Sequence, residues 1–158
     1  MKLNLGCGND MRVDYINIDL RPNPGLPADQ YQQGDMVNLD WLCGDGTVDE
    51  ILALGVVQCV PTTGVGLCVR NWMVKLKKEG TLKIAVPDII GIANAYAKGQ
   101  MALSDFIKLM YGQQEHEHDF FRCGIDRSNL RGLIEQHGAT ITVIRISDGM
   151  LYMEAIKL

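Results

Sequence analysis

Long hydrophobic runs are missing from this sequence, and so is any excess of basic residues. Its apolar stretches fall short of the roughly 20 residues that a membrane-spanning helix requires, so we expect no membrane span. The formal net charge of the 158 residues is −4, which gives no electrostatic footprint for binding nucleic acid. The first residues continue directly into a strand-like pattern, so no signal peptide is expected.

Paired cysteines and internal repeats are absent too. The five cysteines are scattered without a C-x-x-C pair, which is typical of reduced thiols in a cytoplasmic protein. A nucleophilic thiol at Cys7 or Cys59 stays open as an alternative, and it would need a positioned base. With 47% hydrophobic and 22% charged residues, the chain is predicted to form one domain over residues 1–158.

The order of the expected elements indicates an α/β fold. Strand patterns occur at residues 2–5, 15–20, 34–37, 48–54, 81–86, 140–146 and 150–156. Helix patterns occur near 29–33 and over 65–78, 87–98, 103–110 and 126–137, with a proline-rich loop at 21–28. Alternating strands and helices imply a mostly parallel sheet. Residues 147–149 are too short a link for a crossover, so the last two strands form an antiparallel hairpin.

The stretch LNLGCGND, residues 3–10, places Gly6 and Gly8 directly behind the first expected strand. In an open parallel sheet, ligands bind beyond the carboxyl ends of the strands, and glycine lets a ligand approach the backbone. Asp19 ends the second strand, where its carboxylate can accept hydrogen bonds from ribose hydroxyls. Asp35 lies in or just after the third strand, where we expect it to contact the edge of an adenine ring. A lone Gly-x-Gly also occurs in simple turns, but this row of three sites favours a nucleoside-like ligand.

The stretches LNLGCGND, INIDL, GDM, DEILAL and LKKEGTLKIAVPD resemble the class I S-adenosylmethionine-dependent methyltransferases. More narrowly, they resemble a small bacterial and phage branch whose sequences begin with LNLGCG. The resemblance implies a Rossmann-like, mostly parallel sheet with a C-terminal antiparallel hairpin. The first helix is missing or very short, because only residues 9–14 separate the glycine loop from the second strand. An NAD(P)-dependent oxidoreductase is the alternative, and Met11, the short loop and the hairpin argue against it.

The resemblance also implies a cofactor, S-adenosylmethionine, with S-adenosylhomocysteine as its product. The glycine loop would pass under the methionine and ribose, Asp19 would hold the ribose, Asp35 and Met36 would flank the adenine, and the end of the fourth strand would lie near the sulfonium. The residues expected to bind the cofactor are Asn4, Gly6, Cys7, Gly8, Asn9, Asp19, Leu20, Asp35, Met36, Leu54 and Gly55. A helix N-terminus stabilises bound phosphate groups. A sulfonium cofactor carries no phosphate, so the missing first helix weakens its binding less than the binding of a dinucleotide.

The chain departs from the family at several positions. Asn4 stands where the family has an acidic residue, and Gly55, Gln58 and Cys59 stand where the branch often has a His and a Glu-His pair. A protein that binds S-adenosylmethionine without transferring methyl is therefore an alternative to an active enzyme.

The acceptor side is expected in residues 87–124. The resemblance places a general base at His118, and Asp88, after the fifth strand, is a second candidate. The stretch QQEHEHDFF could also bind a metal or be a solvated loop, but without a third ligand spacing no metal site is assigned. Few residues remain outside the sheet, so a small-molecule, glycan or lipid-linked acceptor would meet a cap of residues 87–124 or the second subunit of a homodimer.

Overall fold

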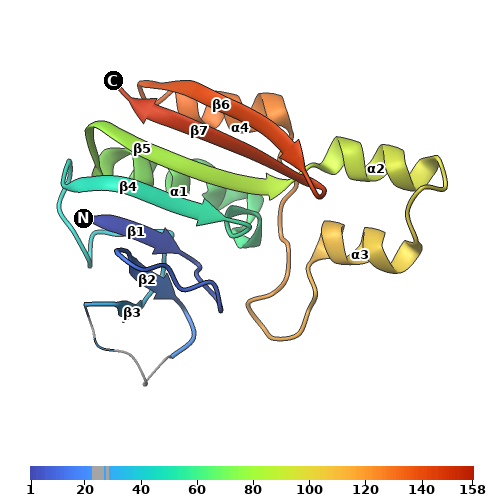
Figure 1. The fold of residues 1–158 in the computed structure, drawn as a ribbon, viewed down its shortest axis with the longest axis horizontal. Coiled ribbons are helices and arrows are strands. Elements are labelled where there is room, and N and C mark those ends of the chain that lie inside the picture. Colours follow the sequence, from blue (N-terminus) through green and yellow to red (C-terminus); the bar gives the residue numbers. More distant parts are fainter. Residues whose placement is uncertain (23–26, 28) are drawn as a thin grey trace.

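The structure is a computed structural model that describes residues 1–22, 27 and 29–158 (Figure 1). Its elements are β1 (Lys2–Leu5), β2 (Ile16–Asp19), β3 (Tyr31–Gln33), β4 (Val48–Leu54), the short 3-10 helix η1 (Val57–Cys59), α1 (Thr62–Lys75), β5 (Leu76–Pro87), α2 (Ile89–Ala97), α3 (Leu103–Tyr111), α4 (Arg127–Glu135), β6 (Ala139–Ser147) and β7 (Met150–Lys157). The loop expected at 21–28 falls partly on residues 23–26 and 28, which lie outside the described residues.

Seven strands form one sheet in the order β3-β2-β1-β4-β5-β7-β6. The pairs from β3 through β5 are parallel, whereas β7 runs antiparallel to both β5 and β6. The reversal at β7 follows from the short link before it, because two residues between β6 and β7 can only turn the chain back. The expected fold class, a mostly parallel sheet with a C-terminal antiparallel hairpin, is confirmed.

The third strand corrects the sequence prediction. Residues 29–33 were expected as a helix and 34–37 as a strand, but β3 spans Tyr31–Gln33. Tyr31 is buried and pairs in register with Asn17 of β2, so partnership with a neighbouring strand decides the local conformation. The chain turns at Gly34, where a Cβ would lie 2.2 Å from the Trp41 ring. Tertiary packing thus overrides a weak local pattern.

The boundary between α1 and β5 also differs from the prediction. The helix was expected to reach Lys78, but it ends at Lys75 and β5 begins at once with Leu76. Leu76 pairs with Val48 of β4, and a β-bulge follows in this ladder. Pairing with β4 therefore places the lysine-rich segment in a strand, although its sequence has helical spacing.

Two helices cover only one face of the sheet. In Figure 1, α1 and α4 lie behind the strands, and the apolar core fills the space between them and the sheet. Within the described residues, the face toward the viewer carries no helix, because the connection from β1 to β2 is a short loop. Cross-strand polar contacts occupy this face instead: Lys83 Nζ lies 3.0 Å from a carboxylate oxygen of Glu50, and Arg145 stacks over the Tyr152 ring at 4.1 Å.

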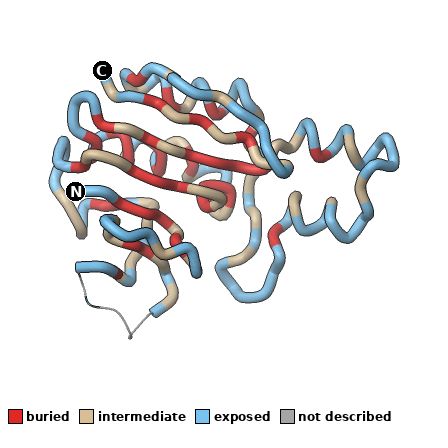
Figure 2. Tube along the Cα trace, in the orientation of Figure 1, coloured by how far each residue is buried: buried red, intermediate tan, exposed pale blue. Residues whose placement is uncertain are grey.

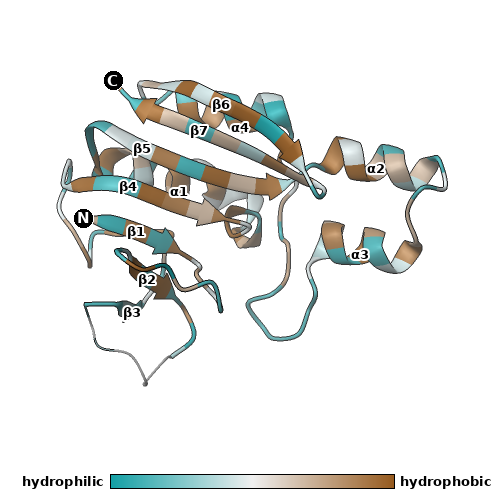
Figure 3. Cartoon of the chain, in the orientation of Figure 1, coloured by the Kyte–Doolittle hydropathy of each residue, from teal (hydrophilic) through white to brown (hydrophobic). Residues whose placement is uncertain are grey.

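Figure 2 and Figure 3 show the same one-sided arrangement. Buried residues run along the central strands, whereas α2, α3 and the segment after them are mostly exposed. Strand β5 alternates hydrophilic and hydrophobic residues, as expected of a sheet with one face packed on the core and the other toward solvent.

Residues 87–124 extend from the sheet at the end where β4 and β5 finish (Figure 1). Helices α2 and α3 pack on each other through stacked rings of Tyr96 and Phe106, whose centroids lie 4.5 Å apart. The chain then returns to the sheet through an irregular segment before α4. Among the residues that the structure describes, no helix is long and apolar enough to cross a membrane.

Candidate functional site

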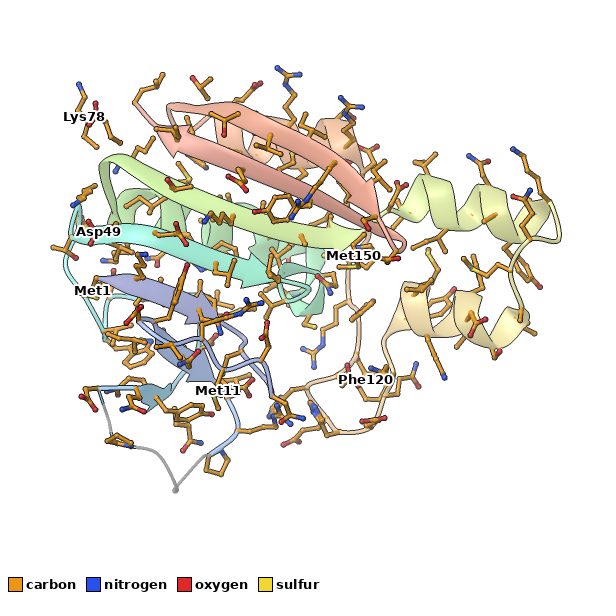
Figure 4. The ribbon with its side chains drawn as sticks, in the orientation of Figure 1. Met1, Met11, Asp49, Lys78, Phe120 and Met150 are labelled. Carbon is orange, nitrogen blue, oxygen red and sulfur yellow. The ribbon has the colours of Figure 1, made fainter. Side chains whose placement is uncertain are left out.

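A pocket of about 370 Å³ opens at the carboxyl ends of the parallel strands. Its walls come from the turns after β1, β2, β3 and β4 and from the segment before α4, which returns to this edge from far along the sequence. Figure 4 labels Met150 and Phe120, both of which lie on this side of the sheet. The position is the one where open α/β sheets bind ligands, next to the first strand.

The glycine turn after β1 presents bare backbone to this pocket. Gly6 has φ +60°, and a Cβ there would lie 2.1 Å from Cγ2 of Val56, so no other residue fits. Gly8 has φ +52°, and its Cβ would lie 3.3 Å from Nη2 of Arg21. Cys7, between them, is buried, and its N–H donates to the carbonyl of Ile18 at 3.0 Å. The turn is thereby fixed to β2 with its glycines facing the pocket.

Asn4 lies beneath this turn and does not line the pocket. Its Nδ2 donates to the carbonyl of Asp10 at 2.7 Å and to Oδ1 of Asn17 at 2.9 Å. Oδ1 of Asn17 also accepts the N–H of Arg12 at 2.8 Å. These buried amides satisfy the backbone of the short loop that replaces the first helix. A carboxylate at position 4 could not donate these bonds, so the short loop requires an amide here.

Asp19 closes β2 with its carboxylate on the glycine turn. Oδ2 accepts the N–H of Gly8 at 2.8 Å, and Oδ1 accepts the backbone N–H of Arg21 at 2.9 Å and its Nε at 3.2 Å. Burial by itself raises the pKa of Asp19, but the hydrogen bonds from Arg21 and Gly8 outweigh it and hold this pKa below its ordinary value. The carboxylate is therefore ionised at neutral pH and fixed in orientation.

The turn after β3 forms the far wall. Asp35 and Met36 line the pocket, and their carbonyls accept bonds from two tryptophans. Nε1 of Trp41 donates to the Asp35 carbonyl at 3.0 Å, and Nε1 of the fully buried Trp72 donates to the Met36 carbonyl at 2.7 Å. Because Trp72 belongs to α1, the core helix itself sets the position of this wall.

The end of β4 supplies the opposite wall. Gly55 lines the pocket with φ +69°, and its N–H donates to the carbonyl of Ala85 at 2.9 Å. Gln58 is buried, and its Oε1 has no hydrogen-bond partner among the residues that the structure describes. Burial raises the pKa of the Cys59 thiol to about 11, with Asp119 adding to the effect, so this thiol is neutral. Burial likewise raises the pKa of Cys7 to about 11, so neither thiol is an activated nucleophile.

The irregular segment before α4 completes the pocket with His116, His118, Asp119 and Arg122. The N–H of Arg122 donates to the carbonyl of Gln58 at 2.7 Å, which ties the segment to the end of β4. His118 Nε2 lies 3.4 Å from a carboxylate oxygen of Glu117. In the part of the chain that the structure describes, no group of three or more potential ligands is placed to hold a metal ion.

The pocket gathers many of the residues expected from the sequence. Those that line it are Gly6, Gly8, Asp19, Leu20, Asp35, Met36, Gly55 and His118. Those that do not line it are Asn4, Cys7, Asn9, Leu54 and Asp88. Asp88 sits just before α2, where its N–H donates to the carbonyl of Gly149 at 2.8 Å.

Sequence reasoning missed the two arginines of the pocket, Arg21 and Arg122. Arg21 follows Asp19 by two positions, and this spacing was a local signal that could have indicated a cation beside the carboxylate. Arg122 had no such signal, because its place in the pocket depends on the path of residues 112–124 back to β4.

No protein-family model and no curated protein matches the sequence. The structure does resemble solved structures. A methyltransferase dependent on S-adenosylmethionine from Methanosarcina mazei matches with a TM-score of 0.70 at 13% identity, over 99% of this chain and 92% of that chain. Another from Mesorhizobium loti matches with a TM-score of 0.68 at 13% identity, over 99% and 90% of the two chains.

A third similar structure is the 1,6-didemethyltoxoflavin-N1-methyltransferase of Burkholderia thailandensis, which contains 1,6-didemethyltoxoflavin and S-adenosylhomocysteine. It matches with a TM-score of 0.63 at 13% identity, over 99% of this chain and 70% of that chain. At such identities the likeness concerns the path of the chain. This chain therefore has the fold of the S-adenosylmethionine-dependent methyltransferases.

Proposed function

We propose that this protein transfers a methyl group from S-adenosylmethionine to a small-molecule, glycan or lipid-linked acceptor. The observation that carries the proposal is the pairing of a bare glycine turn with an ionised, oriented carboxylate in one pocket. Gly8 and Asp19 are hydrogen-bonded to each other at 2.8 Å, at the switch point of a methyltransferase-type sheet. The bound S-adenosylhomocysteine of the Burkholderia thailandensis structure supports this choice of cofactor.

The residues present fit such a cofactor. Gly6 and Gly8 add no side chains of their own to the pocket, although Val56 packs against Gly6 and Arg21 lies near Gly8, so a ribose and a methionine chain could lie against the exposed backbone of the turn. Asp19 would accept hydrogen bonds from the ribose hydroxyls, and the turn containing Asp35 and Met36 would flank the adenine. Leu20 also lines this part of the pocket, whereas Cys7, Asn9 and Leu54, the other members of the proposed set, lie next to lining residues, and Asn4 supports the turn from beneath.

When bound, the cofactor supplies a methyl group activated for in-line displacement. The protein contributes alignment and the exclusion of water, which is worth a large part of the barrier in such reactions. We assign the general base to His118, because it lines the pocket whereas Asp88 does not. Residues 87–124 would close over the acceptor, alone or with a second copy of the chain. We also propose a cytoplasmic location, which the five free cysteines support.

Calorimetry with S-adenosylmethionine, S-adenosylhomocysteine and NAD tests the first part of this proposal. We expect both sulfur-containing ligands to bind and NAD not to bind. The second part requires labelled S-adenosylmethionine and a panel of phenols, amines, carboxylates and glycans. Binding of NAD alone would indicate an oxidoreductase, and binding without transfer to any acceptor would indicate a degenerate cofactor-binding protein.

The role of His118 has a matched control in the same segment, because His116 lines the same pocket. With any acceptor found in that panel, His118→Gln should lower kcat by about 100-fold, the scale of general-base catalysis, and leave the affinity for S-adenosylhomocysteine unchanged. His116→Gln should leave most of the activity. Equal losses in the two variants would show that His118 is not the base.

A further inference from the structure

The pocket has two walls of different electrostatic character. The turns after β2 and β3 contribute Asp19 and Asp35, which are the groups assigned above to the nucleoside. The opposite wall consists of residues 55–56 and 59–61 together with His116, His118, Asp119 and Arg122. If the nucleoside occupies the first wall, the molecule that receives the methyl group must contact the second.

Arg122 is the permanent cation of this second wall. Its backbone N–H donates to the carbonyl of Gln58 at 2.7 Å, and the N–H of Cys123 donates to the same carbonyl at 3.2 Å. Two hydrogen bonds to one buried residue therefore fix the backbone from which the guanidinium projects. Cys59, also in this wall, has a neutral thiol, so it does not compensate the positive charge.

Arg122 differs from the other arginine of the pocket in lacking a partner. Arg21 forms an ion pair with Asp19 at 3.2 Å. Across residues 1–22, 27 and 29–158, none of the ion pairs includes Arg122. The acid of the same wall, Asp119, accepts the N–H of Glu115 at 3.4 Å within its own loop. Arg122 is exposed at the mouth of the pocket, and an arginine in such a place without a carboxylate partner is suited to bind a carboxylate or phosphate through two parallel hydrogen bonds.

We propose that the methyl acceptor is an anionic small molecule whose carboxylate or phosphate group is bound by Arg122. This inference rests on the proposed function, because it assigns the nucleoside to the opposite wall. The positive charge of the sulfonium would further favour an anionic acceptor in this pocket.

The test uses benzoate, phenyl phosphate and the neutral analogue benzamide as probes. Each is titrated calorimetrically into the protein, with and without saturating S-adenosylhomocysteine. We expect the two anions to bind at least about ten-fold more tightly than benzamide, the scale of one charge-assisted hydrogen bond. Arg122→Gln should abolish this preference, whereas Arg122→Lys should retain part of it because the charge remains.

Arg127→Gln is the matched control, because Arg127 is exposed at the start of α4 and lies outside the pocket. This variant should keep the full preference for anions. Equal affinity for benzoate, phenyl phosphate and benzamide in the wild type would overturn the inference, as would a preference that survives in Arg122→Gln. Failure to bind S-adenosylhomocysteine would instead overturn the proposed function, and the titrations without it would still report on Arg122.

Discussion

Replacing Asp19 by asparagine removes the negative charge at the proposed ribose site while keeping the size of the side chain. In the structure, this carboxylate accepts hydrogen bonds from the N–H of Gly8 at 2.8 Å and from two nitrogens of Arg21 at 2.9 and 3.2 Å. A carboxylate offers about four acceptor positions, so at least one is left for a ribose hydroxyl. One hydrogen bond to a charged group is worth about 1.5–3 kcal/mol, which corresponds to a loss of about 10- to 150-fold in affinity for S-adenosylhomocysteine.

Calorimetry measures this loss directly, and thermal unfolding measures it through linkage. At 100 times its dissociation constant, the ligand should stabilise the wild type by about 2.7 kcal/mol. With a 30-fold weaker constant, the same ligand concentration should stabilise Asp19→Asn by only about 0.9 kcal/mol. Asp10→Asn is the control, because Asp10 pairs with Arg12 on the same loop and does not line the pocket. An affinity of Asp19→Asn within two-fold of the wild type would refute the assignment.

The same substitution should change the response of stability to acid. The pKa of Asp19 is lower in the folded protein than its ordinary value, because hydrogen bonds from Arg21 and Gly8 outweigh the effect of burial. Its contribution to stability is therefore complete above the unfolded-state pKa of about 3.9 and is lost as the pH falls through the folded-state pKa. The free energy of unfolding, measured with urea, should thus fall more steeply below about pH 4 for the wild type than for Asp19→Asn.

Two further predictions concern the glycine turn and the buried thiols. Gly6→Ala should destabilise the protein by at least about 2 kcal/mol and abolish S-adenosylhomocysteine binding, because its Cβ would lie 2.1 Å from Val56. Gly46→Ala is the control: Gly46 has φ +65° with open space around it, so this variant should cost only about 1 kcal/mol of backbone strain. Equal unfolding free energies of the two variants would contradict this argument. At pH 8, iodoacetamide should modify Cys59 about 100-fold more slowly than an exposed thiol, because burial raises its pKa from 9.0 to about 11; mass spectrometry showing ordinary reactivity would restore Cys59 as a nucleophile.

Local patterns in the sequence were sufficient where an element depends on its own residues. Strand β4 was predicted at its exact bounds, and the helix expected from residue 126 begins at Arg127, with the side chain of its N-cap Asp126 accepting the N–H of Asn129. The antiparallel ending followed from a link too short for a crossover. In each case the signal lies within a few neighbouring residues, so it is present before the chain folds.

Other features depended on distant partners. Tyr31 became a strand residue because β2 lies beside it, and Leu76 left the helix because it pairs with Val48. The amide of Asn4 donates hydrogen bonds to Asp10 and Asn17, which come close to it only in the folded chain. No periodicity within a short window of sequence contains these contacts.

For the candidate site, the sequence by itself determined the first wall. Gly6, Gly8 and Asp19 follow directly from strand ends, and parallel strands bring their carboxyl ends to one edge. In the second wall Gly55 and His118 were also expected, but only the tertiary structure decided the place of Arg122, because it reaches the pocket through a backbone bond to Gln58, 64 residues earlier in the chain. The ends of strands and the periodicity of side chains depend on neighbouring residues. The contact between a distant segment and a strand end depends instead on how the whole chain packs.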